Sequence, residues 1–125
     1  MMRAFVALAI GAAALASPEA ALAHAFLTRA SPPVGGTVRA MPPELTLRFS
    51  ERVEPAFSSV AVTAPGGERI DGELRVDPAE PAVLRIPLKP PVSGSAGPGA
   101  YKVVWRVVSV DTHVTNGDFT FTVAP

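Results

Sequence analysis

After residue 23 a proline or glycine interrupts the chain every few positions, and this spacing constrains the fold more than any other feature. Residues 24–125 hold 13 prolines and 9 glycines, so few windows are long enough for a helix. Between these breaks apolar residues alternate with polar ones, as in Leu45, Leu47 and Phe49. Alternation with period two is typical of strands that bury one face. The sequence therefore predicts an all-β fold.

Turn residues divide this part of the chain into about seven short strands. They are expected near residues 25–30, 44–49, 58–64, 68–76, 82–88, 100–108 and 116–123. Short strands separated by turns at roughly ten-residue spacing favour a β-sandwich. The strand near 100–108 is apolar on one face and half apolar on the other, so we expect it in the centre of a sheet, with Trp105 in the core. Residues 90–98 are expected to form a loop.

The first 23 residues have the pattern of a secretory signal peptide. Arg3 gives a positive start, and residues 4–16 form an apolar run that is broken by Ser17, Pro18 and Glu19. The small residues around Leu22, in Ala-Leu-Ala, then form a cleavage site. A retained membrane anchor is the alternative, but a spanning helix needs about 20 apolar residues. We therefore expect cleavage after residue 23, which leaves residues 24–125 as a single exported domain.

Charge and composition exclude several classes of function. Eleven basic and eleven acidic residues give a net charge of zero, which argues against a nucleic-acid-binding protein. The absence of cysteine excludes disulfides, thiolate zinc sites, iron–sulfur clusters and a blue-copper thiolate. The sequence has no phosphate-binding loop, H-E-x-x-H or G-x-S-x-G motif. Ser109, Asp111 and His113 resemble a catalytic triad in composition, but neighbours in one strand cannot supply triad geometry.

The two histidines of the chain, His24 and His113, stand at informative positions. Cleavage would make His24 the first residue, whose α-amine and Nδ1 can chelate one metal ion. Asp111 lies two residues before His113, so in a strand-like segment both side chains would point to one side. If the two segments meet, the site holds three nitrogens and one carboxylate oxygen, a set that favours Cu(II). Two alternatives stay open: a histidine that follows the cleavage site by chance, and a hydrogen-bonded turn with an exposed imidazole.

Several motifs resemble those of CopC-type periplasmic copper-binding proteins, in the same order along the chain. They are His24-Ala25-Phe26-Leu27, Ser31-Pro32-Pro33 with Gly35, Leu47-Arg48-Phe49-Ser50-Glu51, the run from Gly99 to His113 that contains Y-x-V-x-W-R-V-x-S-x-D-x-H, and Gly117 with Phe119-Thr120-Phe121-Thr122-Val123. The resemblance covers essentially all of residues 24–125. It implies a seven-stranded Greek-key β-sandwich, described as cupredoxin-like or immunoglobulin-like.

The resemblance also implies a Cu(II) site of the histidine-brace type. His24 would give its amine and Nδ1, His113 an imidazole nitrogen and Asp111 a carboxylate oxygen. Glu51 matches a family glutamate near the site, as a weak axial ligand or a neighbour of the ligands; the alternative is a solvated charge at a strand end. Val114 stands where the family often has a proline, a change that removes no ligand. Met41 is the sole methionine after residue 23, so we expect binding of Cu(II) without Cu(I).

These observations together predict an exported, periplasmic protein that sequesters or delivers copper and is not an enzyme. We expect one Cu(II) per mature chain, a monomer, and a copper-transporting membrane protein as a candidate partner. Two other functions stay under consideration. One is a histidine-brace copper oxygenase that acts on polysaccharides, and the other is an immunoglobulin-like structural module without a metal.

Overall fold

A computed structural model describes residues 24–90 and 97–125. The predicted signal peptide, residues 1–23, and most of the predicted loop at 90–98 lie outside the described residues. In the part of the chain that is described, no helix combines the length and apolarity needed to cross a membrane.

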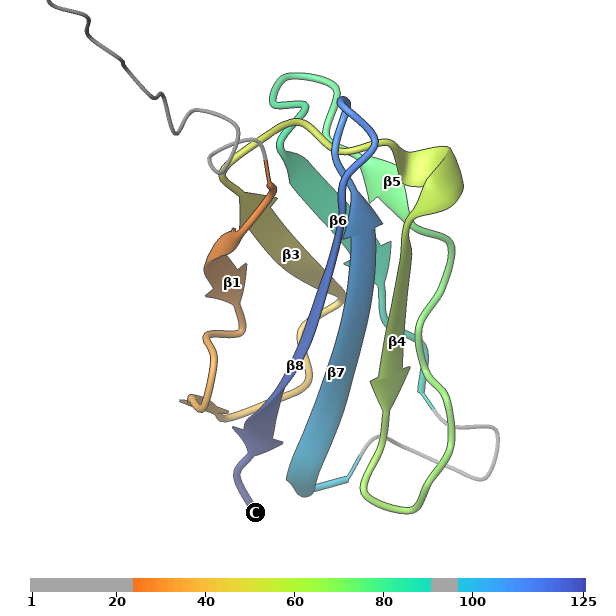
Figure 1. Ribbon diagram of the computed structural model, residues 1–125. Helices are drawn as coiled ribbons and strands as arrows, with labels where there is room; N and C mark the ends of the chain where they lie inside the picture. The colour runs from red at the N-terminus through yellow and green to blue at the C-terminus, as the bar shows by residue number, and fades with distance from the viewer. Residues whose placement is uncertain (1–23, 91–96) are drawn as a thin grey trace, which may run out of the picture.

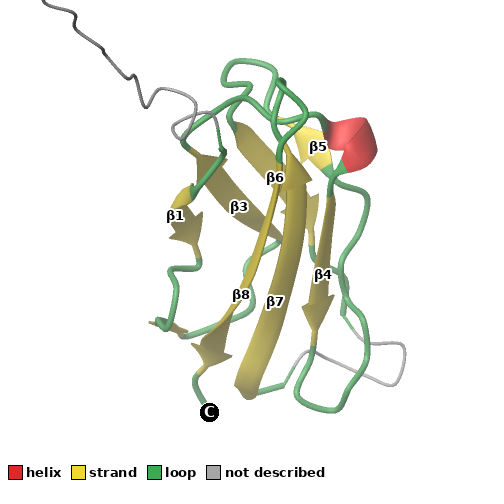
Figure 2. Cartoon of the chain, viewed as in Figure 1, coloured by secondary structure: helices red, strands yellow, loops and turns green. Residues whose placement is uncertain are grey.

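The described chain forms two four-stranded sheets that pack face to face (Figure 1). The first sheet has the order β1 (Leu27–Ser31), β3 (Glu44–Phe49), β6 (Val83–Pro87) and β5 (Arg75–Val76). The second has the order β2 (Thr37–Val38), β8 (Val114–Val123), β7 (Gly99–Val108) and β4 (Ser59–Thr63). One short 3-10 helix, η2 (Pro55–Phe57), is the sole helix of the described residues (Figure 2). The predicted all-β sandwich is confirmed.

The core forms where the alternating apolar faces of the two sheets meet. Leu45, Leu47 and Phe49 of β3 are buried, and the polar residues between them are half-buried. Trp105 of β7 is 8% exposed and meets the Phe49 ring edge-on, with ring centroids 5.2 Å apart. This contact joins the two sheets, because the two residues come from different layers. The predictions of a central strand and of Trp105 as a core residue are both confirmed.

The structure has eight strands, one more than expected, and it divides one predicted strand. The additional strand is β2, whose two residues pair in parallel with β8. Two residues leave no alternation to detect, so this strand depends on its partner rather than on its own sequence. The single strand predicted over 68–76 is wrong. Arg69 bridges to Thr63 of the second sheet, Asp71 bridges to Leu88 next to the first sheet, and only the end of the segment, β5, is a regular strand.

The longest strands place the loop that contains both Asp111 and His113. β7 and β8 pair without interruption from Gly99 and Val123 to Val108 and Val114, which is the longest ladder in the described structure. The loop between them therefore lies at the end of the sandwich where β1 begins (Figure 1).

Candidate metal centre

The two histidines lie side by side. The imidazole rings of His24 and His113 stack with centroids 4.7 Å apart and an angle of 25° between their planes. The ring of Phe26 lies on His24 with a centroid distance of 6.3 Å. The segment that leads into the first strand thus lies next to the loop that carries His113, as the predicted site requires.

Hydrogen bonds from both sheets fix the segment that carries His24. The hydroxyl of Ser50, just after β3, accepts a bond from the Phe26 N–H at 2.9 Å and donates to the His24 carbonyl at 3.3 Å. From the other sheet, the Thr115 hydroxyl donates to the Ala25 carbonyl at 2.7 Å. Ala25 itself is completely buried. The backbone next to His24 is therefore held at a defined position on the sandwich. The roles of Ser50 and Thr115 were not predictable from the sequence, because their contacts depend on the strand pairing.

The segment from Ser109 to His113 is a tight turn, so the strand-like geometry expected from the sequence is wrong. The Thr112 N–H donates to the Ser109 carbonyl at 2.8 Å, and the Ser109 N–H donates to the His113 carbonyl at 2.9 Å. Thr112 has a φ of 70°, in the left-handed region that is rare for a β-branched residue. Even so, the turn brings Asp111 Oδ2 within 3.2 Å of His113 Nδ1. The backbone of this segment is therefore a hydrogen-bonded turn, as in one of the two alternatives to a metal site, and the imidazole of His113 is half exposed.

The buried hydroxyl of Ser109 holds the carboxylate of Asp111 in place. Ser109 is completely buried, and its Oγ donates a hydrogen bond to Asp111 Oδ1. This bond lowers the pKa of the Asp111 carboxyl; partial desolvation opposes the shift, and His113 adds to it. Asp111 is therefore an anion whose Oδ2 faces the imidazole of His113. The order of contacts also differs from a catalytic triad, because the serine hydroxyl is bonded to the carboxylate rather than to the imidazole.

The four residues singled out from the sequence are not all brought together. Glu51 is half-buried after β3 and makes no hydrogen bond or ion pair to His24, Asp111 or His113 within the described residues. Nor do residues 24–90 and 97–125 contain a group of three or more His, Asp or Glu side chains placed to hold a metal ion. Separately, His24 is amide-linked to Ala23 in the 125-residue chain, so the α-amine required by a histidine brace is absent from this chain. The arrangement supplies two adjacent imidazoles and one carboxylate.

The sequence and the fold both match one family. The model of the CopC domain matches residues 27–124. Protein YobA of Escherichia coli strain K12 is 41% identical over 118 residues, which cover 94% of this chain and 91% of YobA.

Two solved structures share the fold and more than 30% sequence identity. CopC from Methylosinus trichosporium OB3b has a TM-score of 0.71 and 33% identity, covering 82% of this chain and 95% of that one. PcoC, a methionine-rich copper resistance protein from Escherichia coli, has a TM-score of 0.67 and 31% identity, covering 81% of this chain and 99% of PcoC. Of these relatives, PcoC is named as a copper resistance protein and not as an enzyme. The chain belongs to the CopC family.

Proposed function

We propose that this protein is an exported Cu(II)-binding protein that sequesters or delivers copper. The observation that carries the proposal is the stacking of His24 on His113, next to the carboxylate of Asp111. Imidazole nitrogens with a carboxylate oxygen are ligands that suit Cu(II). The copper resistance function named for PcoC, a relative of this chain, supports the choice of metal.

The proposed ligands come from two places at one end of the sandwich. Cleavage after Ala23 would free the α-amine of His24, which then chelates together with Nδ1 of the same residue. His113 would supply an imidazole nitrogen, and Asp111 its Oδ2, since Oδ1 is bonded to Ser109. Glu51 follows Ser50, whose hydroxyl contacts the backbone of residues 24 and 26, and this proximity supports a weak axial or neighbouring role.

We further propose that the protein binds Cu(II) without a Cu(I) site. Met41 is partly buried and packs against the hydrophobic core. It is therefore not one of a group of exposed thioether ligands. Cu(I) sites in proteins use soft sulfur ligands, and residues 24–125 hold no cysteine and no other methionine. PcoC, by contrast, is described as methionine rich. Competition with a Cu(I)-specific chelator should therefore leave the protein empty.

Export would place the mature domain, residues 24–125, in the periplasm as a monomer that carries one Cu(II). A copper-transporting membrane protein is the proposed partner, since bound copper has to be received or released. The oxygenase alternative is disfavoured because Tyr101 and Trp105 are buried in the core, so neither ring can form a substrate platform beside the metal.

The decisive experiment compares two proteins that differ by one residue: one that begins at His24 and one that retains Ala23. Intact mass under native conditions and calorimetric titration with Cu(II) give the stoichiometry and affinity. We expect one Cu(II) for the first protein, and at least a tenfold weaker affinity for the second, because its residue 24 has no free amine. His113→Ala in the first protein should weaken binding by a similar factor. Failure of the protein that begins at His24 to bind Cu(II) at micromolar concentration would favour the metal-free structural module.

A further inference from the structure

The outer face of the first sheet carries a row of arginines that crosses all four strands. In the strand register, Arg29 of β1 lies opposite Arg48 of β3, and Arg85 of β6 lies opposite Arg75 of β5. Like charges directly opposite each other in a sheet are destabilising unless other groups compensate them.

Carboxylates compensate two of these four arginines. Glu80 accepts hydrogen bonds from Arg48 on both of its oxygens, each at 2.9 Å. Asp77 and Glu44 both bind Arg85. Within the described residues, Arg29 and Arg75 have no such partner. The face therefore carries four cations and three carboxylates, and at the β1 edge the excess positive charge lies on Arg29.

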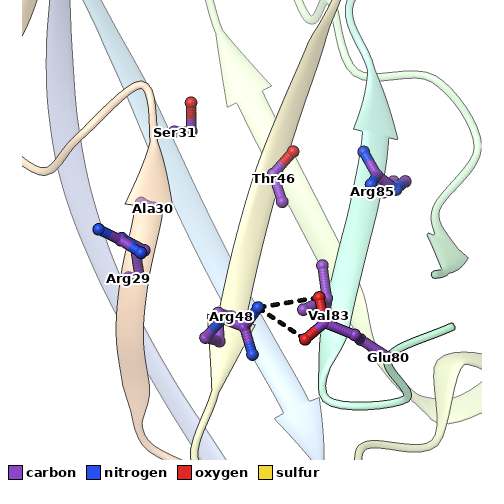
Figure 3. Close-up of a pocket in the computed structure, with 8 residues that line it drawn as sticks. All are labelled: Arg29, Ala30, Ser31, Thr46, Arg48, Glu80, Val83 and Arg85. Atoms are coloured by element: carbon purple, nitrogen blue, oxygen red, sulfur yellow. Dashed lines mark hydrogen bonds and ion pairs between the residues drawn. The ribbon is translucent and has the colours of Figure 1, made fainter.

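A hollow of about 230 Å³ opens beside Arg29, between β1, β3 and β6 (Figure 3). Besides Arg29, its lining includes Ser31 and Thr46, two hydroxyl-bearing residues that are paired in the β1–β3 register. Neither hydroxyl makes a hydrogen bond to another residue of the described chain. A water molecule occupies about 30 Å³ of the liquid, so the hollow has room for a group of several heavy atoms.

We propose that this hollow binds a tetrahedral oxyanion, a phosphate group, through Arg29, Ser31 and Thr46. The guanidinium of Arg29 offers a planar fork of N–H donors that matches two oxygens of a phosphate, and each hydroxyl can donate to a further oxygen. Glu80 also lines the hollow, but its negative charge is neutralised by the two hydrogen bonds from Arg48. The site uses none of the proposed copper ligands, so it does not depend on the proposed function.

The test is a titration of the metal-free protein with inorganic phosphate at constant pH and ionic strength, followed by backbone amide chemical shifts. We expect saturable shifts at residues 29–31 and 46–48, and no such shifts with chloride. Arg29→Gln should weaken binding at least fivefold. The matched control is Arg39→Gln, which removes the same charge from an exposed residue outside the hollow. Chemical shifts that fail to saturate would overturn the proposal. So would an equal loss of phosphate affinity in the Arg29→Gln and Arg39→Gln variants.

Two further variants distinguish a specific phosphate-binding site from non-specific attraction of phosphate to a positively charged surface. Ser31→Ala combined with Thr46→Val keeps every charge and removes both hydroxyls, and it should weaken phosphate binding at least threefold. Glu80→Gln should strengthen binding, because it removes the carboxylate that pairs with Arg48 and leaves the charge of that guanidinium, which also lines the hollow, uncompensated. Unchanged affinity in the double variant would show that the hydroxyls do not bind phosphate and would reject the site as described.

The source of the phosphate group is resolved by a second probe. Vesicles of phosphatidylglycerol and phosphatidylcholine are sedimented with the wild-type protein and with the Arg29→Gln variant. Binding that is lost in the variant identifies a lipid headgroup as the ligand. If the protein stays in the supernatant while inorganic phosphate saturates the site, the ligand is a free phosphate. If neither probe binds, the proposal is wrong.

Discussion

The buried hydroxyl of Ser109 donates a hydrogen bond to Asp111, whose carboxylate stands on the exposed turn beside the histidines. The bond links the core of the sandwich to the proposed metal centre. It also favours the ionised form of Asp111, since a hydroxyl donor stabilises the charged carboxylate more than the neutral acid.

Replacement of this donor should change the titration of the carboxylate. In metal-free protein, Ser109→Ala is expected to raise the pKa of Asp111, because the largest cause of its lowering is removed. The carboxyl carbon shift of Asp111, followed by NMR against pH, measures the effect. Ser59→Ala, at an exposed position of β4, serves as the control and should leave the titration unchanged. An identical Asp111 pKa in both variants would mean that the hydroxyl does not stabilise the anion.

Copper affinity should fall as the pH falls, and the sign follows from competition with protons. Amine and imidazole nitrogens bind Cu(II) in their deprotonated forms, so protons displace the metal. The lowered pKa of Asp111 keeps its carboxylate ionised well into the acid range, so this group does not limit binding near neutral pH.

Chelator competition from pH 8 to pH 5 tests this dependence. Asp111→Asn should weaken affinity across the whole range without moving the midpoint of the pH dependence, since the nitrogens set that midpoint. An affinity that stays constant between neutral and acidic pH would contradict a nitrogen-based site.

The alternating strands were predictable, because half-buried strands leave a period-two pattern in the sequence. β3 begins and ends where that pattern predicts, and β7 differs by one residue at its start. The division of the 68–76 segment was not predictable, because its residues pair first with one sheet and then with the other. The turn at Thr112 was missed for a similar reason: a β-branched residue with a positive φ carries no recognisable turn signal.

Of the candidate site, the sequence identified the residues but not their geometry. The proximity of His24 and His113 could only be stated as a condition, since it depends on how the ends of two sheets are aligned. The stacking of the rings and the bond from Ser109 to Asp111 required the packed sandwich.

Gly117 in β8 allows the core tryptophan to lie against the sheet. It pairs with Trp105 in the β7–β8 ladder, and a Cβ added at Gly117 would lie 2.6 Å from Cζ2 of that ring. Gly117→Ala should therefore displace the indole and reduce the free energy of unfolding by about 1–3 kcal/mol. Urea unfolding monitored by tryptophan fluorescence measures both effects. The matched control is Gly66→Ala, where an added Cβ meets nothing within 4 Å. Equal stability of the two variants would show that the ring can move at no cost.

Asp71 should contribute stability that is lost in acid. Its Oδ1 accepts hydrogen bonds from the Val62 N–H at 2.9 Å and from Arg69 Nε at 2.7 Å. Burial alone would raise the pKa of this carboxyl, but these bonds outweigh it and the pKa is lowered. A lowered folded-state pKa stabilises the protein above the unfolded pKa, and this contribution disappears as the pH falls through the folded value.

Asp71→Asn is accordingly expected to reduce the free energy of unfolding at pH 7 by about 1–3 kcal/mol. The difference from the wild type should shrink at pH 2, where the native carboxyl becomes protonated. Urea denaturation at the two pH values provides the measurement, with Glu73→Gln, an exposed neighbour, as the control. A difference that is the same at both pH values would assign the effect to shape rather than to charge.

Because His24 and His113 adjoin different sheets, copper bound by both residues would affect the stability of the sandwich. His24 leads into β1 of one sheet, and His113 leads into β8 of the other, so an ion held by both would fasten the two layers together. It would close a loop that contains most of the domain, and closing a long loop restricts the unfolded chain. In a protein without cysteine, the cargo ion would thus act as a removable cross-link, whose departure loosens one end of the sandwich.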